Sequence, residues 1–147
     1  MDYKLEVITL AVRDVDQALA FYTEKLGFSL DVDYHPRDRF RVVQLTPPGS
    51  TCSVQLGAGL TDATAGSTRS TYLVVTDIEA ARGELVARGV KVSDIRHKWP
   101  VDQWDGYFAP GPDPERRSYA SMADFADPDG NTWILQEIGY RAASPRL

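Results

Sequence analysis

Two stretches of the chain carry nearly the same order of apolar and polar residues. Residues 10–18 read Leu-Ala-Val-Arg-Asp-Val-Asp-Gln-Ala, and residues 73–81 read Leu-Val-Val-Thr-Asp-Ile-Glu-Ala-Ala. In each copy an apolar strand leads into an aspartate, Asp14 or Asp77, which can accept hydrogen bonds from the free N–H groups of a following helix. The pattern therefore predicts an internal repeat that begins with a strand and a helix.

The two predicted helices each have an apolar face and a defined end. Apolar residues recur at helical spacing in both copies: Val15, Ala18, Leu19, Tyr22 and Leu26 in the first, and Ile78, Ala81, Leu85 and Val86 in the second. Each helix is expected to stop at a glycine, Gly27 or Gly89, because glycine readily adopts the left-handed conformation found there. Further strands are expected at residues 28–32 and 90–92.

A hairpin completes each copy. Strands at 41–45 and 52–56 flank Pro47-Pro48-Gly49, and strands at 118–125 and 131–138 flank Asp127-Pro128-Asp129-Gly130. Both turns carry proline and glycine, which favour reversal of the chain. Each half is then βαβββ, and the fold class is α+β. We expect one domain over residues 1–147, with module one at about 5–57, a linker at 58–69, module two at about 70–138 and a tail at 139–147. The tail is expected to be frayed or docked on a partner.

Composition narrows the class of protein. The 147 residues are 43% hydrophobic, enough for a real core, and carry a formal charge of −5. An acidic chain without a basic block argues against nucleic acid and anionic membranes as partners. No apolar run is long enough to cross a bilayer, and the first residues do not resemble a signal peptide. With a single cysteine, Cys52, the chain is expected to be cytoplasmic.

Two motifs together resemble a known family. Phe21-Tyr22 followed by Leu26-Gly27-Phe28, and the stretch Asp127 to Asn131 before a final strand, are similar to motifs of the glyoxalase / bleomycin-resistance / extradiol dioxygenase family, also called the vicinal oxygen chelate fold. The resemblance covers roughly residues 5–138. It implies two βαβββ modules that form a curved mixed sheet around a cleft, and a homodimer.

At the positions that bind metal in enzymes of this family, this chain has residues that bind metals weakly or not at all. The resemblance places these positions on the first and last strands of each module, at Val7, Gln55, Ser70 and Ile134. Valine and isoleucine have no donor atom, and serine and glutamine are neutral, whereas divalent metals prefer imidazole, carboxylate or thiolate. We therefore expect no metal and no other cofactor.

Four other residues are candidates for acid–base chemistry. His35 and His97 each lie eight residues after a helix-stopping glycine, and Tyr72 and Glu137 are further candidates. The alternative is that both histidines are solvent-facing loop residues and that Glu137 is a salt-bridged surface residue. No motif such as His-x-x-x-His favours the catalytic interpretation.

Strand alternation predicts which residues share the face of the metal positions. The cleft residues expected to bind a ligand are Val7, Thr9, Gln55, Ser70, Tyr72, Thr132, Ile134 and Gln136. They mix small apolar groups with uncharged hydrogen-bonding groups, as in a ligand pocket, although a collapsed core is the alternative. The long segment 99–115 adds four rings that can stack on a flat ligand: Trp99, Trp104, Tyr107 and Phe108. This segment can instead cover a sheet edge or pack on a dimer partner.

Two functions follow from these patterns. The first is a metal-free protein of the bleomycin-resistance type that binds, and so sequesters, an aromatic or natural-product ligand. The alternative is an enzyme, either metal-free or a metal-dependent lyase, isomerase or dioxygenase with displaced ligands. The fold alone is compatible with both functions. The absence of the usual metal ligands favours the binding protein over the enzyme.

Overall fold

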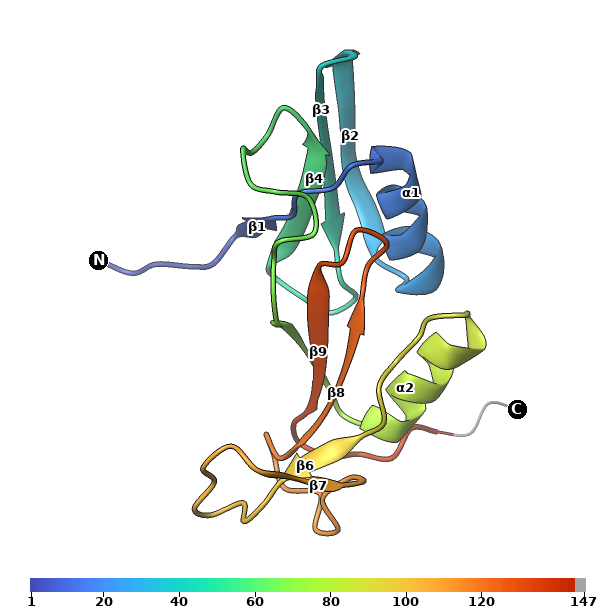
Figure 1. Ribbon diagram of the computed structural model, residues 1–147. Coiled ribbons are helices and arrows are strands. Elements are labelled where there is room, and N and C mark those ends of the chain that lie inside the picture. Colours follow the sequence, from blue (N-terminus) through green and yellow to red (C-terminus); the bar gives the residue numbers. More distant parts are fainter. Residues whose placement is uncertain (145–147) are drawn as a thin grey trace. The chain divides into compact units, whose positions relative to one another are not determined.

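The computed structural model describes residues 1–144 and divides the chain into two compact units (Figure 1). Unit 1 comprises residues 1–69 together with 127–131, and unit 2 comprises residues 70–126 and those from 132 onward. Each unit contains one helical segment and one sheet, in agreement with the predicted α+β class. In the described residues, no helix is long and apolar enough to cross a membrane.

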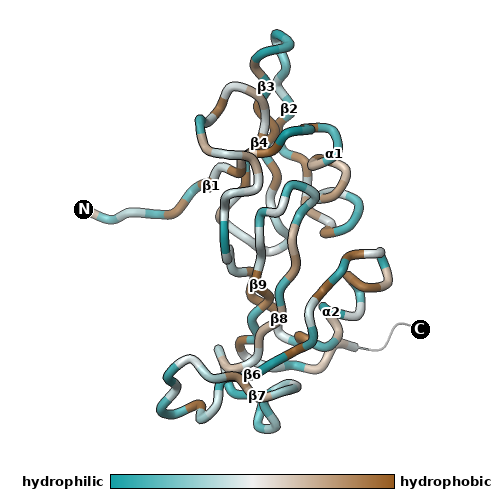
Figure 2. The backbone as a smooth tube through the Cα atoms, viewed as in Figure 1, coloured by the Kyte–Doolittle hydropathy of each residue, from teal (hydrophilic) through white to brown (hydrophobic). Residues whose placement is uncertain are grey.

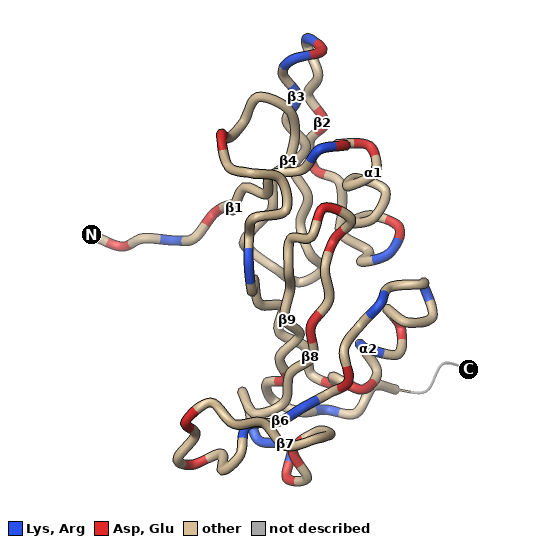
Figure 3. The backbone as a smooth tube through the Cα atoms, in the orientation of Figure 1, with Lys and Arg blue, Asp and Glu red and all other residues tan. Residues whose placement is uncertain are grey.

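Unit 1 has a four-stranded sheet in the order β1-β4-β3-β2. Its elements are β1 (Val7–Thr9), α1 (Val15–Ala20), the π-helical turn η1 (Phe21–Lys25), β2 (Ser29–Arg37), β3 (Phe40–Thr46) and β4 (Ser53–Ala58). Strands β1 and β4 are parallel, and the other neighbours are antiparallel. The far tip of the β2–β3 hairpin is hydrophilic and carries charges of both signs (Figures 2 and 3).

Unit 2 repeats this arrangement and adds a strand, giving the order β5-β9-β8-β6-β7. Its elements are β5 (Thr71–Val75), α2 (Ile78–Ala87), β6 (Arg96–Lys98), β7 (Phe108–Pro110), β8 (Ser121–Ala126) and β9 (Thr132–Glu137). The first and last strands are again parallel, and Tyr72 pairs with Ile134 as Thr9 pairs with Gln55. The internal repeat is therefore present in the strand order and in the register.

The helix ends follow the local sequence signals. Asp14 accepts a hydrogen bond from the Gln17 N–H at 3.0 Å, and Asp77 accepts one from the Ala80 N–H at 3.1 Å. At the other ends Gly27 and Gly89 have φ of 74° and 88°, the left-handed conformation that glycine tolerates. Both predicted caps and both predicted stops are confirmed.

Two elements differ from the sequence prediction. Residues 90–92 form no strand. The carbonyls of Val92 and Ser93 accept from the Arg82 side chain, at 3.3 and 2.7 Å, and the Ser93 N–H donates to Asp124 of β8 at 2.8 Å. The strand begins later, at Arg96. The segment 99–115 is not an uninterrupted loop, since it contains β7, which pairs with β6.

One face of each sheet packs on its helix. In unit 1 this face and the helix share Tyr22, Leu45 and Leu56, all with no exposed area. In unit 2 Phe125 and Trp133 stack with ring centroids 6.4 Å apart on the side that meets α2. In the described residues, no helix of the same unit packs on the opposite side of each sheet, which is called the open face below.

The turn at residues 127–131 belongs to unit 1, although it connects two strands of unit 2. The buried Asp127 carboxylate accepts from the Tyr22 hydroxyl at 2.8 Å and from the Asn131 amide at 2.8 Å. Asn131 also donates to the carbonyl of Ala11 at 3.1 Å. These buried polar groups satisfy one another and fix the turn beside the N-terminal half of the chain.

The described part of the tail packs on its own unit. Gly139 donates to Ser118, and Ala143 donates to the Asp77 carboxylate, both at 2.9 Å. The guanidinium of Arg116 lies 3.8 Å from the centre of the Tyr140 ring. Residues 139–144 therefore pack on their own unit, which differs from the predicted tail that is frayed or docked on a partner, and residues 145–147 lie outside the described residues.

Candidate functional site

The open face of unit 1 carries a row of uncharged polar groups. Thr9, Gln55 and Gln44 lie side by side on β1, β4 and β3, because Thr9 pairs with Gln55 and Gln55 pairs with Gln44. The Gln55 amide nitrogen lies 2.7 Å from the Thr9 hydroxyl. Val7 lies two residues before Thr9 on the same face, next to Ser53.

Exposed apolar residues border this row on β2 and β3. Val32 pairs with Gln44, and Tyr34 pairs with Val42, so both side chains lie on the open face. Tyr34 is 55% exposed and contacts Phe40 edge-on, with ring centroids 6.4 Å apart. This apolar border was not among the residues predicted for the site.

The open face of unit 2 places exposed apolar side chains beside a glutamine. Tyr72 and Val74 on β5 are 49% and 58% exposed, and they pair with Ile134 and Gln136 on β9. Gln136 donates to the carbonyl of Tyr119 at 3.0 Å. Because only the amide nitrogen can donate to a carbonyl, this bond fixes which way the amide group points.

Ser70 and Thr132 meet at the beginning of these two strands. Ser70 precedes β5 and has a φ of 59°, a conformation that is uncommon for serine. Its N–H donates to the Thr132 hydroxyl at 2.7 Å. The two residues predicted to share the site are thus close together, and the Thr132 hydroxyl is used to accept a hydrogen bond from the backbone of Ser70.

Two of the four predicted rings form a cluster with two cations. Trp104 and Phe108 lie with ring centroids 5.3 Å apart. The Arg96 guanidinium lies 4.8 Å from the Phe108 centroid, and the Lys98 ammonium lies 4.7 Å from the Trp104 centroid. Both cations come from β6 (Figure 3).

The other two predicted rings are placed differently. Trp99 is 52% exposed and touches the His97 ring edge-on, with centroids 6.3 Å apart. Tyr107 is 60% exposed, and its carbonyl accepts from the Trp104 indole at 2.7 Å. The loop is therefore ordered by its own contacts, and Tyr107 contributes through its backbone.

Register places this cluster on the open face of unit 2. Arg96 pairs with Met122, and Met122 pairs with Gln136, so the three side chains form one row across the sheet. A shallow, open pocket of about 590 Å³ lies at this end. It is lined by Ser93, Asp94, Ile95, Arg96, Phe108, Ala109, Pro110 and Asp124.

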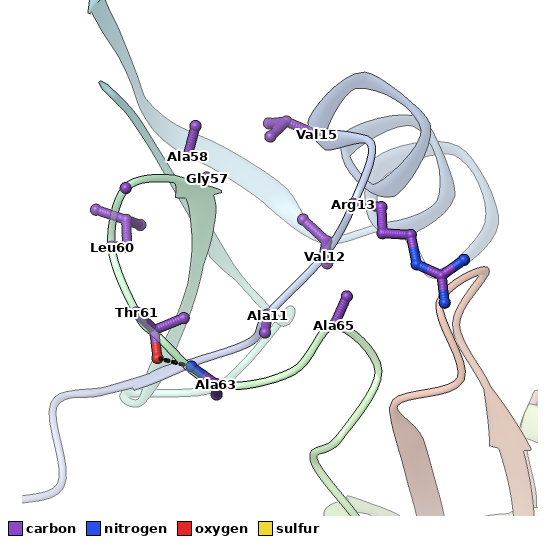
Figure 4. A pocket seen from close by; sticks show the side chains of 11 residues that line it. Ala11, Val12, Arg13, Val15, Gly57, Ala58, Leu60, Thr61, Ala63 and Ala65 are labelled. Carbon is purple, nitrogen blue, oxygen red and sulfur yellow. Dashed lines mark hydrogen bonds between the residues drawn. The ribbon is translucent and has the colours of Figure 1, made fainter. Parts of the chain in front are cut away.

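A smaller pocket of about 190 Å³ lies within unit 1 (Figure 4). Its wall is formed by the segment before α1, the end of β4 and the loop that follows, and includes the small residues Ala11, Ala58 and Ala65. The Arg13 side chain points away from this space. The pocket is therefore lined mainly by small and aliphatic residues, with Thr61 adding a hydroxyl group.

The two histidines have different surroundings, and neither lies in a loop as the alternative predicted. His35 is exposed on β2, whereas His97 on β6 is only 6% exposed. The His97 Nδ1 atom lies 2.8 Å from the carbonyl of Gly111. The expectation of two solvent-facing histidines is thus wrong for His97, because β6 turns this side chain away from the open face.

Glu137 is salt-bridged, as the alternative predicted, but it is not on the surface. Its side chain is 1% exposed and pairs with Arg116 at 2.6 Å. It also accepts from the N–H of Ile78 at 2.9 Å, so it faces α2. Both oxygens are occupied within the protein, and this geometry gives Glu137 a structural role.

Electrostatic interactions in both units are concentrated in compact ion pairs. Hydrogen bonds from Arg117 hold the pKa of the buried Asp113 carboxyl well below its usual range. Arg41 lowers the pKa of Asp33 in the same way through a bidentate contact.

No group of three or more His, Cys, Asp or Glu side chains that could hold a metal occurs in residues 1–144. The positions to which the resemblance assigns metal ligands hold Val7, Gln55, Ser70 and Ile134. Valine and isoleucine have no donor atom, and serine and glutamine are neutral, so these residue types do not suit a divalent metal.

Comparison with known proteins places this geometry in a family. A family model described as the Glyoxalase/Bleomycin resistance protein/Dioxygenase superfamily matches residues 4–135. An uncharacterized protein of Shewanella frigidimarina (strain NCIMB 400) is 30% identical over 132 residues, which are 89% of this chain and 90% of that protein.

Two solved structures are similar over nearly the whole chain. TnmS3, an antibiotic binding protein from Streptomyces sp. CB03234, has a TM-score of 0.70 at 28% identity, and the match covers 93% of this chain and 97% of TnmS3. A superfamily member from Sphaerobacter thermophilus DSM 20745 has a TM-score of 0.69 at 26% identity, with 92% and 98% covered. The chain therefore belongs to the glyoxalase, bleomycin resistance protein and dioxygenase superfamily.

Proposed function

We propose that this protein binds and sequesters a flat, aromatic small molecule without chemical conversion and without a metal. The observation that carries the proposal is the open face of unit 2. There the exposed Tyr72 and Val74 lie beside the uncharged Gln136, and the Trp104–Phe108 pair lies on the same face. Apolar walls with a few fixed polar groups are typical of small-molecule sites.

The polar groups on the open faces are suited to binding rather than to chemistry. Gln136 is fixed by a backbone carbonyl, and Gln55 lies beside Thr9. Amide groups of this kind orient a ligand but do not transfer protons near neutral pH. TnmS3 is an antibiotic binding protein, and this likeness supports an antibiotic or a related natural product as the ligand class.

We further propose that the protein acts as a homodimer in the cytoplasm. Tyr3 and Leu5 are 88% and 71% exposed on the extended segment that precedes β1. Strand β1 is an edge strand of its sheet, and exposed apolar side chains at a sheet edge favour association. Sedimentation analysis of the intact protein tests this: a monomer at micromolar concentration would contradict the dimer.

Ligand binding is tested by calorimetric titration of aromatic natural products that first raise the melting temperature in a thermal-shift screen. Trp104→Ala and Tyr72→Ala, both at the open face of unit 2, should each weaken binding while leaving the fold intact. Val86→Ala, on the exposed side of α2, is the matched control and should bind as the wild type does. Unchanged affinity in both site variants would contradict the proposed site.

Metal and turnover are tested separately. Addition of Zn²⁺, Ni²⁺, Co²⁺ or Fe²⁺ should leave the melting temperature unchanged, and a large saturable rise would contradict the metal-free proposal. Chromatography of a bound ligand after long incubation should recover it unaltered. Conversion of the ligand would instead support the enzyme, with Tyr72 as the residue to substitute first, because it is exposed on the open face.

A further inference from the structure

The charged groups around the cation–aromatic cluster, which lies on β6 and the following loop, differ in whether they form ion pairs. Arg96 forms an ion pair with Asp124, so its charge is compensated within the protein. Asp94, which also lines the larger pocket, lies 3.6 Å from Arg82. In the same loop, Asp102 lies 3.8 Å from Arg117, which also pairs with Asp113 at 2.8 Å and Glu115 at 3.2 Å.

Lys98 is in a different position. In the described part of the chain, no carboxylate lies within 4.0 Å of its ammonium group. This includes the carboxylate of Asp105, the residue that follows Trp104. Its contact is the Trp104 ring, 4.7 Å away. The aromatic end of the open face therefore presents one ammonium group that has no carboxylate partner in the described residues, although the chain as a whole carries −5.

The ring and the cation are held in place together. The Trp104 indole donates to the Tyr107 carbonyl at 2.7 Å, and the backbone N–H of Lys98 donates to the Ala120 carbonyl at 3.0 Å. Lys98 pairs with Phe108 across β6 and β7, so the ammonium and both rings lie on one side of the sheet. A ligand ring that stacks on these rings would bring its substituents within reach of the ammonium.

We propose that the ligand is an aromatic molecule with an anionic substituent, such as a carboxylate or an ionised phenol, and that Lys98 recognises the anion. The inference deepens the proposed function and rests on it. The rings supply binding that does not depend on ligand charge, and Lys98 adds selectivity through a charge-assisted contact. The acidic remainder of the protein disfavours anions elsewhere on its surface.

A pair of fluorescent probes that differ in one charge tests this. Anilinonaphthalene sulfonate is an aromatic anion, and N-phenylnaphthylamine is the same ring system without the sulfonate. The wild-type protein should bind the anion about two- to fivefold more tightly, as expected for a partly exposed charge pair. Lys98→Gln should bind both probes equally, with the affinity for the neutral probe unchanged. Lys91→Gln, which removes an exposed lysine elsewhere in unit 2, is the control and should keep the preference.

The outcomes separate the two proposals. A preference that persists in Lys98→Gln, or equal binding of both probes by the wild type, would overturn the role of Lys98 and leave aromatic binding in place. Trp104→Leu should weaken both probes by the same factor, because it removes the ring and not the charge. Failure of both probes to bind would contradict the proposed function and the inference together. The anion preference should also shrink as salt is added, while binding of the neutral probe should not.

Discussion

The Arg116 guanidinium donates two hydrogen bonds to the Glu137 carboxylate, at 2.8 and 2.6 Å, and the Glu137 side chain is only 1% exposed. Breaking this pair strands a buried charge. Arg116→Met should therefore cost about 3–5 kcal/mol of unfolding free energy. Urea denaturation measures the loss.

The control for this prediction uses a second partner of the same arginine. Glu79 lies 2.8 Å from Arg116, but its side chain is 58% exposed. Glu79→Gln should cost less than about 1 kcal/mol, because exposed ion pairs contribute little. Equal losses in the two variants would show that burial of Glu137 does not determine the strength of the interaction.

Glycines at two positions should respond to alanine with opposite signs. A Cβ at Gly66 would lie 2.0 Å from the Asp129 carbonyl oxygen, and Gly66 has a φ of 78°. A Cβ at Gly83 in α2 meets no heavy atom within 4 Å. Gly66→Ala should destabilise by about 1–3 kcal/mol, and Gly83→Ala should stabilise by about 0.5–1 kcal/mol. Thermal unfolding of both variants checks the signs, and a stable Gly66→Ala would mean that the turn at 127–131 is not held against the linker.

Removal of one hydroxyl should weaken the attachment of the same turn. Tyr22 donates to Asp127 at 2.8 Å in a buried site. Tyr22→Phe should cost about 1.5–3 kcal/mol, the usual range for a hydrogen bond to a charged group. Tyr34→Phe, at a tyrosine that is 55% exposed, should change stability by less than about 0.5 kcal/mol. Chemical denaturation that finds both variants equal would assign the Tyr22 hydroxyl no part in stability.

Acid should weaken the protein through Asp113. Arg117 lowers the pKa of this buried carboxyl, so the folded state holds the ionised form more strongly than the unfolded state does. The contribution to stability is present above the unfolded pKa of about 4 and is lost as pH falls toward the folded pKa. The stability gap between the wild type and Asp113→Asn should therefore narrow from pH 6 to pH 3 in urea titrations. Asp102→Asn, at a carboxylate that is 88% exposed, is the control and should change stability by less than about 0.5 kcal/mol at pH 6.

Local signals in the sequence predicted much of the fold. The caps at Asp14 and Asp77 and the stops at Gly27 and Gly89 depend on residues within four positions of each other, so the sequence displays them directly. The pairing of Thr9 with Gln55 and of Tyr72 with Ile134 follows from the repeat combined with strand alternation. Most of the proposed open-face residues could be named for this reason.

Features that depend on distant side chains were not visible in the sequence. Arg82 binds the carbonyls of Val92 and Ser93, at the end of a segment where the apolar alternation predicts a strand and the structure has none. The strand that replaces it, residues 96–98, is polar throughout and gives no strand signal. Its two cations, Arg96 and Lys98, were therefore missed as site residues. His97 lies between these two residues in the sequence. Because successive side chains of a strand point to opposite faces, this position could have indicated that His97 points away from the face of Arg96 and Lys98.

The assignment of residues 127–131 to the first unit has a consequence for synthesis on the ribosome. Residues 1–69 leave the ribosome well before Asp127 and Asn131 are made, and until then the Tyr22 hydroxyl and the Ala11 carbonyl lack these partners. The N-terminal half of the nascent chain must therefore wait for the last hairpin before its polar interior is complete. A chain that is released early, before residue 127, would carry this defect permanently and would be a natural target for proteolysis.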